Sequence, residues 1–141
     1  MIYVTRREVF SSAHRLHNTN LTDEENKNLY GKCNNANGHG HNYTLEVIVG
    51  GEIDPQTGYV VDLKELKTII IDNVVKKVDH KHLNHDVDFL EGINPTTENF
   101  AVNIWFALIG AISITILGLG ASWWPAVSAS NIDPVKTINS L

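Results

Sequence analysis

The chain has 141 residues, which is the length of one ordinary domain. Its formal net charge of -5 at pH 7 argues against nucleic acid as the main partner, although an acidic protein can hold a small anion in a locally positive site. The single cysteine, Cys33, excludes an internal disulfide, and without a secretory signal ahead of the first expected strand a reducing cytoplasm is the expected location.

The first half of the sequence predicts two strands separated by a long polar loop. Residues 2–13 alternate in character and are rich in β-branched side chains, and residues 41–49 form a second strand. The apolar side chains of the second strand share one face: Tyr43, Leu45, Val47 and Val49. Residues 18–37 are rich in Asn, Thr and Asp, so we expect a loop there with a short helical turn near residues 23–29. Two strands make only a marginal sheet, which later strands or other subunits must complete.

The second half predicts two helices. Asp62 occupies the capping position of the first helix, whose buried stripe has helical spacing. This stripe consists of Leu63, Leu66, Ile70 and Val74. Residues 79–88 form a loop rich in His and Asp, and Pro95 opens a second helix that runs past Trp105. The order strand, loop, strand, helix, helix predicts an α+β domain with an antiparallel sheet and both helices on one face.

Three histidines have a spacing that suggests a metal site. His39 and His41 are separated by one residue at the start of a strand, so their side chains point to the same face. His14 ends the first strand, which we expect to lie beside the second. Three converging imidazoles leave one coordination position open, which is the arrangement of a catalytic zinc site. Histidines scattered through polar loops are the alternative, and His17 is a weaker competing ligand.

Two further motifs have a catalytic and a structural interpretation. Cys33 lies beside Lys32 in a small polar loop, a setting that suits a reactive thiol as well as a plain loop residue. Asp79 precedes His80, and a carboxylate that orients an imidazole is familiar catalytic chemistry. Adjacent side chains do not normally face each other, so this pairing requires a turn, and a solvated loop is the alternative.

A third motif, Thr96-Thr97-Glu98, stands where the second helix should begin. Threonine is a good capping residue, and an acid is favourable near the positive end of the helix dipole. The residues themselves therefore favour a structural role as a helix N-terminus.

Four segments occur together in a recognisable order. They are residues 10–16 (FSSAHRL), 31–43 (GKCNNANGHGHNY), 79–83 (DHKHL) and 95–99 (PTTEN). In combination they resemble the 6-pyruvoyl-tetrahydropterin synthases and the related 6-carboxy-tetrahydropterin synthases of queuosine biosynthesis. The resemblance covers residues 1–105.

This resemblance implies a fold, a set of site residues and a reaction. The fold is the tunnelling fold, in which antiparallel strands pair between subunits into a barrel, commonly in a homohexamer. The implied roles are zinc ligands at His14, His39 and His41, a catalytic Cys33 with its partners Asp79 and His80, and a pterin pocket lined by Thr96, Thr97 and Glu98. The implied substrate is 7,8-dihydroneopterin triphosphate, from which triphosphate is expelled. The spacing of five residues between Cys33 and His39 favours the pyruvoyl branch over the carboxy branch.

The resemblance stops near Trp105. The last strands of the family should carry a glutamate that anchors the pterin ring, but no Asp, Glu, Lys or Arg lies between Glu98 and Asp133. Residues 104–126 are instead a continuous uncharged run, long enough to cross a bilayer as a helix. Residues 123–135 resemble the end of the last membrane helix in ABC-transporter permeases of the macrolide-export type.

We therefore expect residues 106–141 to be an apolar tail foreign to the enzyme fold, with a helix in place of the last two strands. A chimeric or frameshifted reading frame, a fusion to a membrane anchor and an unusual core helix are three explanations that the sequence leaves open. The functional alternatives are a non-catalytic pterin- or metal-binding domain and a protein associated with a membrane through residues 104–126. The expected partners are the pterin triphosphate and further copies of the chain.

Overall fold

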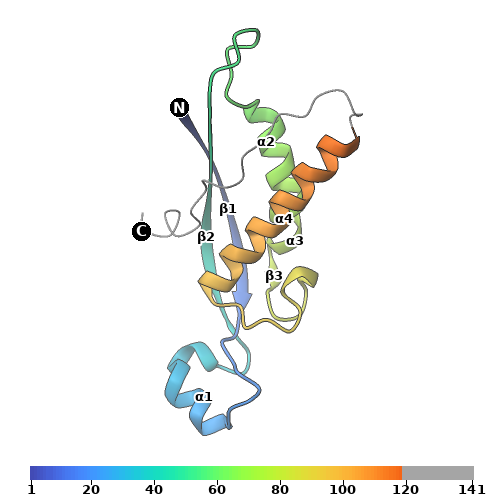
Figure 1. Cartoon of the computed structure of the whole chain (residues 1–141). Coiled ribbons are helices and arrows are strands. Elements are labelled where there is room, and N and C mark those ends of the chain that lie inside the picture. Colours follow the sequence, from blue (N-terminus) through green and yellow to red (C-terminus); the bar gives the residue numbers. More distant parts are fainter. Residues whose placement is uncertain (119–141) are drawn as a thin grey trace.

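A computed structural model of the chain describes residues 1–118, in which three strands pack against helices (Figure 1). The elements are β1 (Ile2–His14), α1 (Asp23–Tyr30), β2 (His39–Gly51), α2 (Leu63–Ile70), α3 (Lys76–Val78), β3 (Lys81–His82) and α4 (Thr97–Gly118). Short helical turns occupy Gly31–Asn34, Ile71–Val75 and Asp88–Leu90. The predicted α+β class is confirmed.

The sheet has the strand order β2-β1-β3. The long strands β1 and β2 are antiparallel over their whole length, with Ile2 opposite Gly51 and His14 opposite His39. The short strand β3 runs parallel to β1 beside Ser12 and Ala13. The expectation of an antiparallel sheet is therefore wrong for β3. The helical stretch after β2 carries the chain from Gly51, opposite the start of β1, back to the end of β1, so the next strand runs in the same direction as β1.

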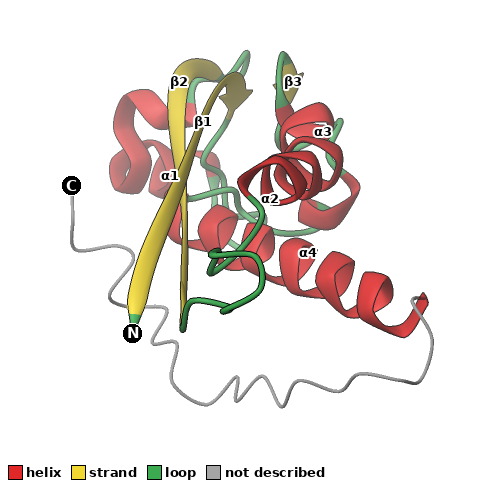
Figure 2. Cartoon of the chain, turned by 90° about the horizontal axis from the view of Figure 1, so that it is seen from above, coloured by secondary structure: helices red, strands yellow, loops and turns green. Residues whose placement is uncertain are grey.

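The helices α2, α3 and α4 lie to one side of the strands, whereas α1 lies at the end where β1 finishes (Figures 1 and 2). The predicted cover of one sheet face by helices agrees with this arrangement. The core consists of Phe10, Leu66, Ile70, Val74, Val78, Leu83, Val87, Leu90, Phe100, Ile104 and Leu108. The face of β2 that carries Tyr43, Leu45, Val47 and Val49 packs against this cluster.

A turn of π-helix, Ile71–Val75, joins α2 to α3 and keeps one stripe of the stretch buried. The buried residues recur at intervals of four: Leu66, Ile70, Val74 and Val78. An α-helix has 3.6 residues per turn, so a strict interval of four would rotate off the core, and the wider π turn offsets this drift. Leu63, which the sequence placed in the stripe, is 45% exposed because the stripe begins one turn later.

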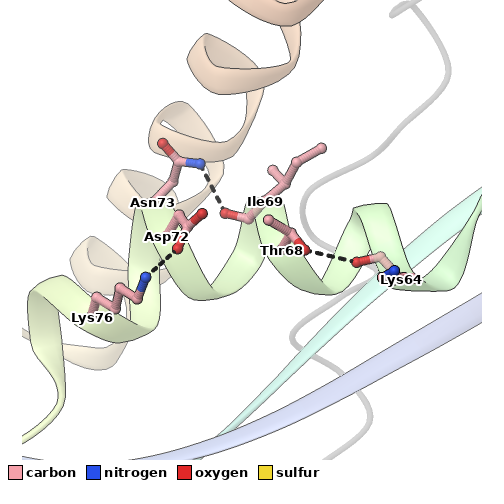
Figure 3. A network of polar contacts seen from close by, with 6 residues as sticks. All are labelled: Lys64, Thr68, Ile69, Asp72, Asn73 and Lys76. Carbon is pink, nitrogen blue, oxygen red and sulfur yellow. Dashed lines mark hydrogen bonds and ion pairs between the residues drawn. The ribbon is translucent and has the colours of Figure 1, made fainter.

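The outer side of this stretch is held by local polar contacts (Figure 3). The Asn73 side chain donates to the carbonyl of Ile69 at 2.9 Å, and Lys76 forms an ion pair with Asp72 at 2.6 Å. Each contact joins a residue of the π turn to a residue four positions away, outside the turn. Side chains therefore supplement the backbone hydrogen bonds where the helix changes its pitch. Asp62 caps α2 as predicted, because its carboxylate accepts from the amides of Lys64 and Glu65.

The helix α4 continues without interruption past residue 105 and is described to Gly118. No helix in the described part of the chain combines the length and apolar character that crossing a membrane requires. The rest of the uncharged run, residues 119–126, lies outside the described residues, as does the segment that resembles a permease. The predicted apolar helix in place of the last strands is therefore not confirmed, and the division at residue 105 stays a prediction.

Candidate metal centre and active site

Strand pairing brings three histidines together at one end of the sheet. His14 is the last residue of β1 and stands directly opposite His39, the first residue of β2, while His41 stands opposite Ser12. The ring centroids are 4.6 Å apart for His14 and His39, 5.0 Å for His14 and His41, and 4.7 Å for His39 and His41. One nitrogen from each ring lies within 4.8 Å of the other two, so the three imidazoles can hold a single metal ion.

The hydrogen bond of His14 fixes which nitrogen faces the cluster. Its Nδ1 lies 2.7 Å from the carbonyl oxygen of Pro95. A carbonyl only accepts, so Nδ1 carries the proton and Nε2 presents a lone pair. A backbone carbonyl behind a ligating imidazole is a common device for orienting the ring. Nothing in the sequence indicated this role of Pro95, since any residue supplies a carbonyl.

His39 carries the strongest indication that the cluster binds a cation. Both of its ring nitrogens are shielded from solvent, and neither has a hydrogen-bond partner. Buried polar atoms without partners are rare and costly, and a metal ligand resolves the deficit. Burial lowers the pKa of both His39 and His14, and the neighbouring imidazoles lower it further, so both rings are neutral near pH 7. Neutral imidazole is the form that binds zinc, so this donor set fits the metal.

His82 packs beside the cluster, which the sequence did not indicate. Its Nδ1 is buried without a partner, and its ring stacks on His85 with centroids 4.5 Å apart. Gly38, at φ 71, lies so close that a Cβ there would come within 2.7 Å of His82 Nε2. The turn that leads into His39 and His41 therefore requires glycine at this position.

Cys33 lies in the turn Gly31–Asn34 as a half-buried free thiol. The turn is fastened to the residues after β1, because the amide of Leu16 donates to the carbonyl of Cys33 at 2.9 Å and the Asn34 side chain donates to the carbonyl of Leu16 at 2.7 Å. These contacts use only the backbone of Cys33, which leaves its thiol outside the hydrogen bonds that hold the turn.

Asp79 and His80 form a carboxylate–imidazole pair. On sequence grounds, this pair was expected only if the chain turns between the two residues. His80 adopts a positive φ of 56°, which turns the chain and brings its Nδ1 to 3.0 Å from Asp79 Oδ1. The backbone N–H of Ser11 also donates to Oδ1, at 2.9 Å. The His80 side chain is 82% exposed and lines a pocket of about 560 Å³ together with His41 of the cluster. No hydrogen bond joins Cys33 to either residue within the described residues.

The helix N-terminus at residues 96–98 has the structural role that the sequence favoured. The Thr96 hydroxyl accepts from the amide of Asn99 at 3.3 Å, and the Thr96 carbonyl accepts from the amide of Phe100. Thr97 and Glu98 are exposed. The preceding residue, Pro95, holds His14, so this helix start is anchored to the histidine cluster. The pterin-binding role of the three residues stays a prediction.

His17, the competing ligand considered from the sequence, does not belong to the cluster. Its Nδ1 lies 3.0 Å from the side-chain nitrogen of Asn34, on the turn that carries Cys33. Within the described residues the metal-binding group consists of His14, His39 and His41 alone.

The contacts of the Asp79 carboxylate predict that part of the protein's thermal stability is lost at acid pH. The Ser11 amide, followed by the His80 side chain, lowers the pKa of Asp79 below its usual 3.8. A carboxyl group with a depressed folded-state pKa stabilises fully above its unfolded value and loses that contribution as pH falls through the folded value. We therefore expect the difference in Tm between the wild type and Asp79→Asn to be constant from pH 5 to 7 and to shrink below about pH 4. Thermal unfolding followed by circular dichroism tests this, and a difference unchanged down to pH 3 would contradict it.

The chain is similar to known proteins in both sequence and fold. The family model for 6-pyruvoyl tetrahydropterin synthase matches residues 3–116. The chain is 49% identical over 114 residues to a 6-pyruvoyl tetrahydrobiopterin synthase of Poecilia reticulata, covering 81% of this chain and 78% of that protein. It is 48% identical over 114 residues to the Homo sapiens protein of the same description, covering 81% and 79%. The solved 6-pyruvoyl tetrahydropterin synthase of Caenorhabditis elegans superposes with a TM-score of 0.74 at 44% identity, over 78% of each chain.

Proposed function

The chain belongs to the 6-pyruvoyl tetrahydropterin synthase family, and on that premise we propose that it is a zinc-dependent lyase that acts on 7,8-dihydroneopterin triphosphate. The observation that carries the proposal is the cluster of His14, His39 and His41, whose ligand atoms converge and whose His39 nitrogens have no other partner. The relatives described as 6-pyruvoyl tetrahydrobiopterin synthases supply the reaction.

The three imidazoles would hold zinc, and when bound the metal supplies Lewis-acid polarisation of the oxygens on the substrate side chain. His14 enters this set as a preorganised ligand, because its other nitrogen donates to the Pro95 carbonyl. His39 and His14 remain neutral because burial lowers their pKa, so protons do not compete strongly for their lone pairs at neutral pH.

Proton transfer falls to Cys33 and the Asp79–His80 pair. Cys33 as thiolate would take a proton from the carbon chain beside the pterin ring and return it on another carbon. Asp79 orients His80 through the 3.0 Å contact, so the imidazole is placed to relay the proton. Triphosphate leaves as the side chain becomes the pyruvoyl group. Cys33 lies in the turn Gly31–Asn34, whereas the exposed His80 lies between α3 and β3.

Assembly of several copies is part of the proposal. The strand β2 lies at the edge of the sheet over its 13 residues, so it offers a long row of backbone groups for pairing. The exposed His80 stands free to meet a neighbouring copy, which would account for the absence of a hydrogen bond to Cys33 among the described residues. Light scattering of the purified protein tests the oligomer, and a well-folded monomer would count against it.

One observation favours a second candidate, a pterin-binding domain without turnover. The anchoring glutamate that the family carries near its end has no counterpart between Glu98 and Asp133. A pocket without that carboxylate would hold the ring of the pterin less firmly and reduce the rate.

Product analysis decides between these functions. Zinc-loaded protein is incubated with 7,8-dihydroneopterin triphosphate, and the products are separated and identified by mass spectrometry. We expect release of inorganic triphosphate together with 6-pyruvoyl-tetrahydropterin. Formation of 6-carboxy-tetrahydropterin would assign the carboxy branch, whereas pterin binding without triphosphate release would identify the non-catalytic domain.

A further inference from the structure

A second pocket adjoins the histidine cluster and shares no lining residue with the pocket that contains His80. It has a volume of about 630 Å³ and is formed by the loop after β1, by α1 and by the turn that carries Cys33. His39 is one of its lining residues, so the pocket adjoins the histidine cluster. The proposed proton-transfer chemistry leaves this space without a role.

The pocket gathers positive charge in an acidic protein. Arg15, Lys27 and Lys32 line it, which is three of the eleven lysines and arginines in a chain of net charge -5. Among the described residues, each of the other three arginine and lysine side chains that form ion pairs has a carboxylate partner: Arg6 with Glu8, Arg7 with Glu46 and Lys76 with Asp72. None of the three pocket cations forms an ion pair with any described residue, so their combined charge is available to an anion.

Arg15 is held in a fixed orientation within this pocket. Its Nε donates to the backbone carbonyl of Asn34 at 3.1 Å, and one terminal nitrogen donates to the Asn34 side-chain oxygen at 3.2 Å. These two contacts use neutral acceptors, so the guanidinium keeps its full charge and its remaining N–H groups. A preordered guanidinium is well suited to phosphate, because its planar fork loses little entropy on binding.

We propose that this pocket holds the triphosphate of the substrate, and the inference rests on the proposed function. A chain of three phosphates carries several negative charges, and a substrate whose side-chain oxygens lie at the histidine cluster would extend its phosphates past His39. Three cations around 630 Å³ match that charge and size. The same groups would also hold inorganic triphosphate after its expulsion.

The pocket contains one carboxylate, whose neutralisation should have the opposite effect on anion binding to that of neutralising a lysine. Asp23, in the first turn of α1, lines the same space. A negative group near the anion weakens binding, so its neutralisation should strengthen it. The lysines Lys27 and Lys32 are exposed, which makes their replacement by glutamine compatible with the fold.

Calorimetric titration with sodium tripolyphosphate tests the pocket without turnover. We expect the Lys27→Gln/Lys32→Gln double variant to bind roughly tenfold more weakly than the wild type, and Asp23→Asn to bind a few-fold more tightly. Lys67→Gln, which removes the same charge from exposed α2, should bind within about twofold of the wild type. Tripolyphosphate chelates metals, so the zinc content of each sample is measured before and after titration. None of these variants changes an imidazole, so chelation affects all of them equally.

Kinetics separate this inference from the proposed function. With an active wild type, the double variant should raise KM for 7,8-dihydroneopterin triphosphate by roughly tenfold, with a smaller change in kcat. Equal tripolyphosphate binding by wild type and double variant, or no binding by the wild type, would overturn the inference even if the enzyme is active. Charge-dependent binding without any turnover would instead refute the proposed function and leave the anion pocket standing.

Discussion

The His39→Ala variant is expected to lose stoichiometric zinc and nearly all turnover. The wild type should retain about one zinc per chain after dialysis, because three imidazoles complete a catalytic site. Removal of His39 leaves only His14 and His41, and two imidazoles do not make such a site. We expect the remaining zinc to fall below about a tenth of stoichiometry and kcat/KM to fall at least about 10³-fold. Zinc is measured by plasma mass spectrometry, and turnover by triphosphate release.

In the metal-free protein, by contrast, the His39→Ala substitution should not lower the thermal stability. Both ring nitrogens of His39 are buried without partners, so the apo fold carries an unsatisfied polar group that alanine removes. We therefore expect the Tm of apo His39→Ala to equal or exceed that of the apo wild type. Added zinc should raise the Tm of the wild type and leave that of the variant unchanged, because only a ligand that binds the native state stabilises it.

A histidine outside the cluster provides the matched control. His85 is exposed and lies near the site through its stacking on His82, but it contributes no ligand atom. The variant His85→Ala should keep full zinc content and the zinc-dependent rise in Tm. Full zinc retention in His39→Ala, or equal loss of zinc in both variants, would contradict the assignment of the cluster.

The histidine cluster was predictable because strand geometry is periodic. His39 and His41 had to share a face, since side chains alternate along a strand with a period of two. The contribution of His14 required the two strands to be paired in a particular register, and the register places it opposite His39. The face of Tyr43 that packs on the core was predictable for the same reason. Local periodicity thus predicted both the sheet face and two of the three histidines of the cluster.

The remaining features depend on contacts between distant parts of the chain. The parallel strand β3 has only two residues, too few for any pattern. The carbonyl of Pro95 that orients His14 leaves no trace in residue type. The pocket of Arg15, Lys27 and Lys32 forms only because the long loop after β1 folds back on itself. Its polar composition predicted a loop, but loop composition does not determine which cations come together.

Cys33→Ala is expected to keep zinc and lose most turnover. The thiol is not a member of the histidine cluster, and the fold uses only the carbonyl of Cys33, which accepts from the amide of Leu16. Alanine keeps that carbonyl, so the far-ultraviolet circular dichroism spectrum and the zinc content should match those of the wild type. If the thiolate moves the proton, its loss removes a group that acts in the transition state, and kcat should fall by about 10²–10⁴-fold with little change in KM.

Two comparisons make the result for Cys33 specific. Cys33→Ser keeps the size of the side chain but replaces a thiol by a hydroxyl, which is a weak proton acceptor near neutral pH, so it should resemble alanine in rate. His80→Ala removes the proposed relay from an exposed position, so it should lower kcat while leaving zinc in place. Unchanged turnover in Cys33→Ala would remove the thiol from the mechanism. Loss of zinc in that variant would instead make Cys33 a fourth ligand, and a closed four-ligand site is structural rather than catalytic.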